Sequence, residues 1–195
     1  MGNRPGSSQE FARAYLERVT TLLATLDTKE VGRVIDLLLD ARRRDATIFF
    51  MGNGGSAATA LHFANDMGVC ASPEGCKPFR AISLTANTSL ITCLANDIGY
   101  ENAFSWQLRN LMRPGDLVVG ISASGNSPNV VRGFEYASQN GGVTVAIVGF
   151  DGGVMKKIAK YAIHVVTDQG EYGPSEDVHM VLDHLISTFL ALIPE

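Results

Sequence analysis

Four side chains suited to acid–base or metal chemistry fall on two segments with helical spacing. His62 and Asp66 are four residues apart, which puts them on one face of a predicted helix. Glu176 and His184 are eight residues apart on another predicted helix, close to two turns, so they also share a face. Two imidazoles and two carboxylates are the donor types of a tetrahedral Zn²⁺ site. The spacing therefore predicts an acid–base or metal centre between the two helices.

These residues also have structural interpretations. Glu176 lies near the start of a helix that follows Gly173 and Pro174, where a carboxylate is favourable whatever else it does. A lone histidine is usually structural, and we expect this of His164, which lies inside a predicted strand. The grouping of two histidines with two acids is what favours function.

A glycine-rich loop, Gly52-Asn53-Gly54-Gly55-Ser56, follows the strand predicted over 47–51 and opens a helix. Glycines allow positive φ and let the backbone approach an oxyanion closely. Ser56 then lies near the helix N-terminus, where free N–H groups and the helix dipole favour a phosphate. An ordinary strand-to-helix turn rarely needs three glycines and an asparagine together, so this loop predicts anion binding.

A serine-rich loop, Ser122-Ala123-Ser124-Gly125-Asn126-Ser127, follows another predicted strand, and Pro128 begins the next helix. Its hydroxyls and backbone amides are typical of a neutral phosphate cradle. Ser127 is also expected to cap the helix. Open α/β sheets bind ligands at the carboxyl ends of their strands, so two such loops at neighbouring strand ends predict one shared site.

The common nucleotide signatures do not occur in the sequence. There is no G-x-x-x-x-G-K-S/T run, and no G-x-G-x-x-G followed by an acidic residue about twenty positions later. The predicted ligand is therefore a sugar phosphate rather than a nucleotide.

Short apolar runs alternate with helical segments, which predicts βαβ units, a parallel sheet and right-handed crossovers. We expect one doubly wound α/β domain over residues 1–195, with a helical hairpin in 1–45 and a core in 46–195 that has a five-stranded parallel sheet flanked by helices. The strands are predicted over 47–51, 79–84, 117–121, 143–148 and 163–166, and the helices over 9–26, 28–43, 56–68, 88–96, 101–112, 128–140, 154–160 and 174–192.

Composition and charge exclude several classes of protein. The 195-residue chain has a formal net charge of −4, and its one basic run, Arg42–Arg44, lies at a predicted helix end. A nucleic-acid-binding surface is therefore not expected. No apolar stretch is long enough to span a membrane, and the polar N-terminal residues do not resemble a signal peptide. Cys70, Cys76 and Cys93 lack metal-type spacing and are interpreted as reduced thiols of a cytoplasmic protein.

These motifs resemble those of a known family. The glycine-rich loop, His62, the run Ala95-Asn96-Asp97-x-Gly99 and the serine-rich loop with Pro128 look like a sugar isomerase (SIS) domain. Over nearly its whole length the chain resembles the phosphoheptose isomerases. The resemblance implies an SIS fold and an aldose–ketose isomerase, which converts sedoheptulose 7-phosphate to D-glycero-D-manno-heptose 7-phosphate through a cis-enediol.

The resemblance also implies roles for the two helices. A zinc site in this family uses His and Glu on the first helix and Gln and His on the last, so His62 and His184 match it. Asp66 stands where the family has Glu, and Glu176 stands where it has Gln. Asp is one methylene shorter and Glu adds a charge, so these departures bear on whether Zn²⁺ is bound. Asp66 would be the general base, with Glu176 as its rival, and His184 would be the acid–base partner on the sugar oxygens.

Substrate contacts follow from the same resemblance. Asn53, Asn96 and Asp97 would bind sugar hydroxyls, although Asn96 and Asp97 could equally shape a turn. The phosphate would be bound by the two loops, through Gly54, Gly55, Ser56, Ser122, Ala123, Ser124 and Ser127.

Wide apolar faces on the helices over 9–26 and 174–192 predict a homo-oligomer. The related isomerases are tetramers with sites at subunit interfaces, so we expect a tetramer. Two alternatives remain at this point: a non-catalytic SIS sensor or adaptor, such as a relative that binds the replication-initiator protein, and an isomerase of another sugar phosphate. The retained histidines and acids favour the enzyme.

Overall fold

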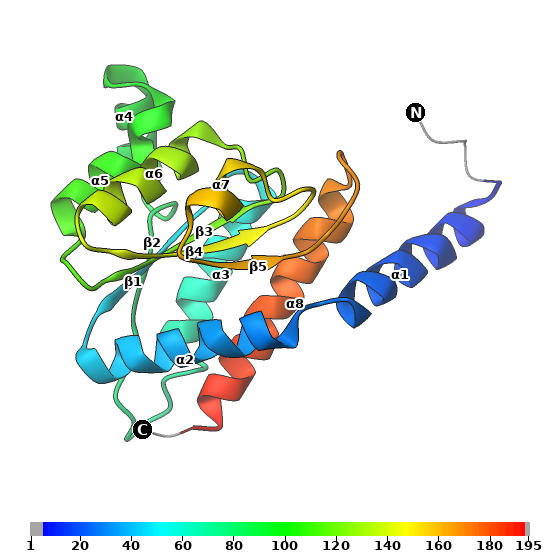
Figure 1. Cartoon of the computed structure of the whole chain (residues 1–195), viewed down its shortest axis with the longest axis horizontal. Helices are drawn as coiled ribbons and strands as arrows, with labels where there is room; N and C mark the ends of the chain where they lie inside the picture. Colours follow the sequence, from blue (N-terminus) through cyan, green and yellow to red (C-terminus); the bar gives the residue numbers. More distant parts are fainter. Residues whose placement is uncertain (1–5, 194–195) are drawn as a thin grey trace.

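A parallel sheet of five strands lies at the centre of the computed structural model, in which residues 6–193 are described (Figure 1). The strand order is β2-β1-β3-β4-β5. Because β2 and β3 pair with opposite edges of β1, the order reverses between β1 and β3, and these two strands flank the topological switch point. The strands are β1 (Thr47–Met51), β2 (Arg80–Ser83), β3 (Leu117–Ser122), β4 (Val143–Val148) and β5 (Tyr161–His164).

Helices connect the strands and cover the sheet on both sides (Figure 1). They are α1 (Ser8–Ala24), α2 (Thr28–Arg44), α3 (Gly55–Gly68), α4 (Thr88–Asp97), α5 (Ala103–Leu111), α6 (Pro128–Gln139), α7 (Gly153–Ile158) and α8 (Tyr172–Ala191), with a short 3₁₀ helix at Tyr100–Asn102. Within residues 6–193, no helix has the length and apolar character needed to cross a membrane.

Apolar side chains cover both faces of the sheet, which explains why the strands are continuous apolar runs. On one face, Ile48 and Phe50 of β1 pack in a core with residues of α2, α3 and α8. On the other face, Phe49 and Met51 pack in a second core with residues of α5, α6 and α7. Neighbouring residues of β1 thus point to opposite layers, as the two-residue period of a strand requires.

The predicted fold class is confirmed, and most elements end within one or two residues of their predicted bounds. The last strand begins two residues earlier than expected, so His164 is its final residue. The predicted helix over 101–112 is divided into the 3₁₀ helix and α5. Both N-terminal helices form, but α1 packs mainly against α8 and extends away from the sheet (Figure 1). Residues 25–27, which link α1 to α2, all lack the positive φ with which many helices end.

Helix α8 presents one buried face to the sheet and to α3. Its fully buried apolar residues are Val178, Leu182, Ile186 and Leu190. Beside them runs a row of polar residues at four-residue spacing, all at most 2% exposed: Ser175, His179, Asp183 and Ser187. A row of this kind lies on one stripe of a helix, so α8 carries polar groups into the interior of the domain.

The imidazole of His179 is a fully buried titratable group in this row. It is 0% exposed, and neither ring nitrogen makes a hydrogen bond of good geometry within the described residues. Burial lowers the pKa of His179 to about 4, and the nearby backbone of Val148 offsets only part of the shift. The side chain is therefore neutral at pH 7.

This shift predicts a pH-dependent stability. Between pH 6.5 and about 4, His179 is protonated in the unfolded chain but stays neutral in the folded chain. Protonation therefore stabilises the unfolded state, and the free energy of unfolding falls as the pH falls. The slope is up to about 1.4 kcal/mol per pH unit. In urea denaturation across this range, His179→Gln should lose that part of the slope relative to the wild type, since the other titrating groups are common to both proteins. Equal slopes would contradict a neutral, buried imidazole.

Candidate active site

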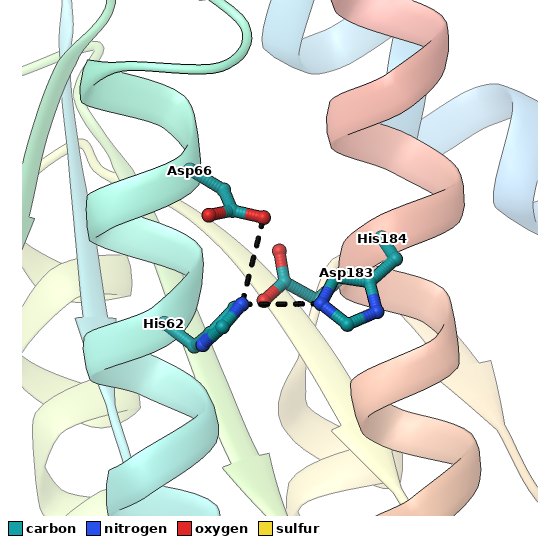
Figure 2. Close-up of side chains that lie close together, drawn as sticks. All are labelled: His62, Asp66, Asp183 and His184. Carbon is teal, nitrogen blue, oxygen red and sulfur yellow. Dashed lines mark hydrogen bonds and ion pairs between the residues drawn. The ribbon is translucent and has the colours of Figure 1, made fainter.

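Helices α3 and α8 lie side by side and bring two histidines into contact (Figure 2). The Nε2 atoms of His62 and His184 are 3.1 Å apart, and Asp66 Oδ2 lies 3.6 Å from Nε2 of His62. Asp183 completes the group. Each of the four residues offers one ligand atom, and these atoms lie within 4.8 Å of one another. We call these four residues the His/Asp cluster.

The two carboxylates of the cluster are buried and close to each other. Asp183 is 0% exposed, and neither of its oxygens has a hydrogen-bond partner among the described residues. Burial, and then the charge of Asp66, raises the pKa of Asp183 to about 7. Asp66 is held by the side-chain amide of Asn65, which donates at 3.1 Å, and by the hydroxyl of Ser187 at 3.4 Å. A buried acid without a partner is costly unless a cation or proton satisfies it.

The cluster has the chemistry of a cation site. It offers two imidazole nitrogens and two carboxylate oxygens, a donor set that suits Zn²⁺. The unpartnered oxygens of Asp183 point into the same space as the two histidines (Figure 2). The residues present therefore fit a bound divalent metal.

Glu176 lies away from the cluster. It precedes His184 by eight residues, which is about 12 Å along the helix axis, so a shared face does not bring the two side chains together. The sequence spacing suggested Glu176 as the second acid of the cluster, but in the structure that acid is Asp183. Glu176 instead packs against the start of α3, where a methyl group on Gly55 would collide with its carboxylate. Burial, followed by the charge of Asp177, raises the pKa of Glu176.

A pocket of about 160 Å³ lies where the two predicted loops meet. The loops follow β1 and β3, the strands on either side of the switch point. The residues lining this serine-loop pocket are Asn53, Ser56, Ile121, Ser122, Ala123, Ser124, Ser127, Tyr172 and Glu176. The geometry thus gathers the first loop, the second loop and the start of α8 around one small polar space.

The hydroxyls of the serine loop converge on one another. Ser122 Oγ lies 3.2 Å from Ser127 Oγ and 3.5 Å from Ser124 Oγ, and it accepts a hydrogen bond from the Gly125 amide at 3.1 Å. Ser127 occupies the N-cap position of α6, but its side chain makes no capping hydrogen bond. The expectation of side-chain capping was therefore wrong, because the hydroxyl turns toward Ser122 instead.

Two helices begin at this pocket without a capping side chain at their N-cap positions. Helix α3 starts after Gly54, which has no side chain to cap it, and α6 starts after Ser127 without a side-chain cap. The N–H groups at the start of α3 and the positive ends of two helix dipoles favour an anion between them. At α6, Pro128 has no N–H group and the Val130 amide donates to Asn129 Oδ1 at 3.0 Å, so the dipole is its main contribution. This arrangement can bind a phosphate without any lysine or arginine in the pocket lining.

The other predicted sugar ligands lie in different settings. Asn53 lines the pocket, but its amide exchanges two 2.8 Å hydrogen bonds with Asn129, and its Oδ1 also accepts from the Tyr100 hydroxyl at 2.7 Å. Asn96 and Asp97, at the exposed end of α4, bond to each other at 2.8 Å and are not among the residues lining the pocket. In this structure they shape the helix end.

Sequence reasoning missed two residues of the site. Asp183 sits next to His184, and its four-residue spacing from His179 was the available signal that it shares the buried stripe of α8. Tyr172 begins α8 and lines the pocket, and no motif in the sequence marked it.

Comparisons with known proteins agree with this arrangement. The SIS domain family matches residues 10–149. A probable phosphoheptose isomerase of Thermoplasma acidophilum is 37% identical over 179 residues, 92% of this chain and 97% of that protein. The phosphoheptose isomerase of Akkermansia muciniphila is 40% identical over 160 residues, 82% of each chain. Among solved structures, phosphoheptose isomerase GmhA from Neisseria gonorrhoeae superposes with a TM-score of 0.84 at 29% identity, covering 96% of this chain and 100% of that one. The chain therefore belongs to the SIS domain family and, within it, to the phosphoheptose isomerases.

Proposed function

We propose that this protein isomerises sedoheptulose 7-phosphate to D-glycero-D-manno-heptose 7-phosphate. The observation that carries the proposal is the pairing of an acid–base cluster with an anion pocket on the same two helices, α3 and α8. The relatives, which are phosphoheptose isomerases, support the reaction class.

The substrate would span the two parts of the site. Its phosphate would bind in the serine-loop pocket, between the hydroxyls and the two helix N-termini. His62 lies seven residues after Gly55, about 10 Å further along α3. A seven-carbon sugar phosphate is long enough to bridge much of that distance, so its C1 and C2 would reach the His/Asp cluster.

Proton transfer between C1 and C2 needs a base, a partner for the oxygens and stabilisation of the enediolate. We assign Asp66 as the general base, because it is part of the cluster and held in place by Asn65 and Ser187. His184 would move protons at the sugar oxygens. Glu176 is the rival base: it lines the pocket, and its raised pKa suits an acid–base group.

We also propose that the His/Asp cluster binds Zn²⁺ through His62, Asp66, Asp183 and His184. When bound, the metal would act as a Lewis acid toward the carbonyl oxygen of the sugar. Its charge would satisfy the buried carboxylate of Asp183. Asp66 has two carboxylate oxygens, so it would be a ligand through one and keep the other for proton transfer.

A homo-oligomer, which we expect to be a tetramer, is the third part of the proposal. An apolar groove of about 530 Å³ on the outer face of α8 is lined by Val181, His184, Leu185, Thr188, Phe189 and Leu192. Exposed apolar surface of this kind is typical of a subunit interface. Since His184 lines the groove as well as the cluster, a second copy packed there would border the active site.

The isomerase proposal predicts the effects of three substitutions. His184→Ala should reduce turnover of sedoheptulose 7-phosphate about 10²-fold or more while leaving binding in place. Asp66→Asn should reduce turnover nearly as much as His184→Ala does, and Glu176→Gln should reduce it less. If Glu176→Gln reduces turnover more than Asp66→Asn, Glu176 is the base. Glu135→Gln, at an exposed position on α6 that lines neither the serine-loop pocket nor the groove on α8, is the control.

A coupled assay gives turnover, and calorimetry gives binding. Wild-type protein that binds the sugar phosphate without isomerising it would contradict the enzyme and favour a sensor. Equal affinity for the free sugar and its phosphate would contradict the pocket assignment.

The metal proposal predicts that Asp183→Asn weakens Zn²⁺ binding at least about tenfold, because one anionic ligand is lost. Glu176→Gln is the matched control and should keep the affinity. Metal content after dialysis and the shift of Tm on adding Zn²⁺ both report on binding without an activity assay. Loss of metal in Glu176→Gln but not in Asp183→Asn would overturn the ligand set.

The oligomer proposal predicts a mass near four times 20.9 kDa in light scattering. Leu185→Asp places a charge in the apolar groove and should dissociate the assembly. Val69→Asp, at an exposed position beyond the end of α3, should not. A wild-type mass of one chain at working concentration would end the proposal.

A further inference from the structure

Among the described residues, the side-chain hydrogen bonds that leave helix α1 all go to the start of α8. The guanidinium of Arg18 donates two hydrogen bonds to Glu171, from Nε to Oε1 at 3.1 Å and from Nη2 to Oε2 at 2.6 Å. The Tyr15 hydroxyl donates to Asp177 Oδ2 at 2.6 Å. A forked pair of this geometry holds the orientation of both partners as well as their separation.

The partner of Arg18 is the residue that immediately precedes α8. Glu171 Oε2 also accepts from the Asp168 amide at 2.8 Å, and the Glu171 carbonyl accepts from the Ser175 hydroxyl at 2.9 Å. Ser175 in turn lies 2.7 Å from the hydroxyl of Thr167. Arg18 therefore holds a residue that ties the preceding loop to the first turn of α8.

That first turn supplies two residues of the serine-loop pocket, Tyr172 and Glu176. The ring of Phe150 packs edge-on against Tyr172, with centroids 5.0 Å apart, and so supports it from the sheet side. On the α1 side, Gly173 lies so close that a methyl group there would be 2.8 Å from the Tyr15 hydroxyl. The pocket wall is thus held between the sheet and α1.

Apolar packing also holds α1, through the buried Leu22 and the partly buried Val19 and Leu23. The ion pair adds a contact of fixed orientation at the start of α8. The ion pair is only about a third exposed, 34% for Arg18 and 28% for Glu171, and it joins residues 153 positions apart. The Arg33–Glu30 pair is also 2.6 Å long, but it joins neighbours within one helix and lies away from the pocket.

We propose that Arg18 is a positioning residue for the serine-loop pocket: through Glu171 it fixes the first turn of α8, and with it Tyr172 and Glu176, in the geometry that accepts a sugar phosphate. The inference rests on the proposed function for the identity of the ligand. If the first turn of α8 is already ordered, ligand binding does not have to lose conformational entropy to order it. Removing the Arg18–Glu171 pair should therefore weaken ligand binding more than it slows the chemical step at the distant His/Asp cluster.

The test compares Arg18→Met with Arg33→Met, the matched control. Calorimetry measures the dissociation constants of sedoheptulose 7-phosphate and of inorganic phosphate, the assay gives kcat and KM, and thermal unfolding gives Tm. Arg18→Met should raise KM and both dissociation constants about fivefold or more, with kcat changed less than twofold. Arg18→Lys keeps the charge but not the fork, so its dissociation constants should be intermediate. Arg33→Met should bind like the wild type.

A lower Tm with unchanged dissociation constants would show a merely structural ion pair and overturn the proposal. So would equal effects of Arg18→Met and Arg33→Met. If the wild type binds the sugar phosphate but does not isomerise it, the proposed function fails, and the phosphate dissociation constants still decide the role of Arg18.

Discussion

The packing of α8 against α3 is the constraint on which the site depends. Each helix buries apolar residues in the same core, Phe63 and Met67 from α3 and Leu182 and Ile186 from α8. That contact leaves little freedom for the residues beside it, because protein interiors are close-packed. Asp183 follows Leu182 directly, so the burial that orients the leucine also carries the carboxylate inward. The cost of an unpartnered, buried acid is then offset only by what the cluster can bind.

The two halves of the site suit charges of opposite sign. The serine-loop pocket uses hydroxyls, backbone amides and helix dipoles, which attract an anion without a counter-ion. The His/Asp cluster concentrates negative charge and imidazole nitrogens, which suit protons and cations. Glu176 lines the serine-loop pocket, where burial, followed by the charge of Asp177, raises its pKa. The separation along α3 and α8 would keep a phosphate in the serine-loop pocket away from the buried acids of the cluster.

The sequence predicted the parts of the site that depend on topology. Strands β1 and β3 end at the same edge, so the loop at Gly52–Ser56 and the loop at Ser122–Ser127 had to meet once the sheet was parallel. Helical spacing also put His62 on one face with Asp66, and the two do lie together in the cluster. Residue spacing could not decide between Glu176 and Asp183 as the member of the cluster. A period of 3.6 residues shows which residues share a helix face, but it does not show how far one helix is shifted along, or rotated against, its neighbour. Those are set by apolar side chains of α3, α8 and the sheet, which are far apart in the chain.

The position of α8 in the chain has a consequence for biosynthesis. His62 and His184 are separated by 122 positions, and ribosomes add about 5–20 residues each second, so the first histidine waits on the order of 10 s for the second. During that interval α8 does not yet cover its face of the sheet, which includes Phe50 and Ile147. A nascent chain in this state exposes the kind of apolar surface that chaperones recognise. It also cannot assemble the four donors, so a metal would be acquired only after α8 has docked.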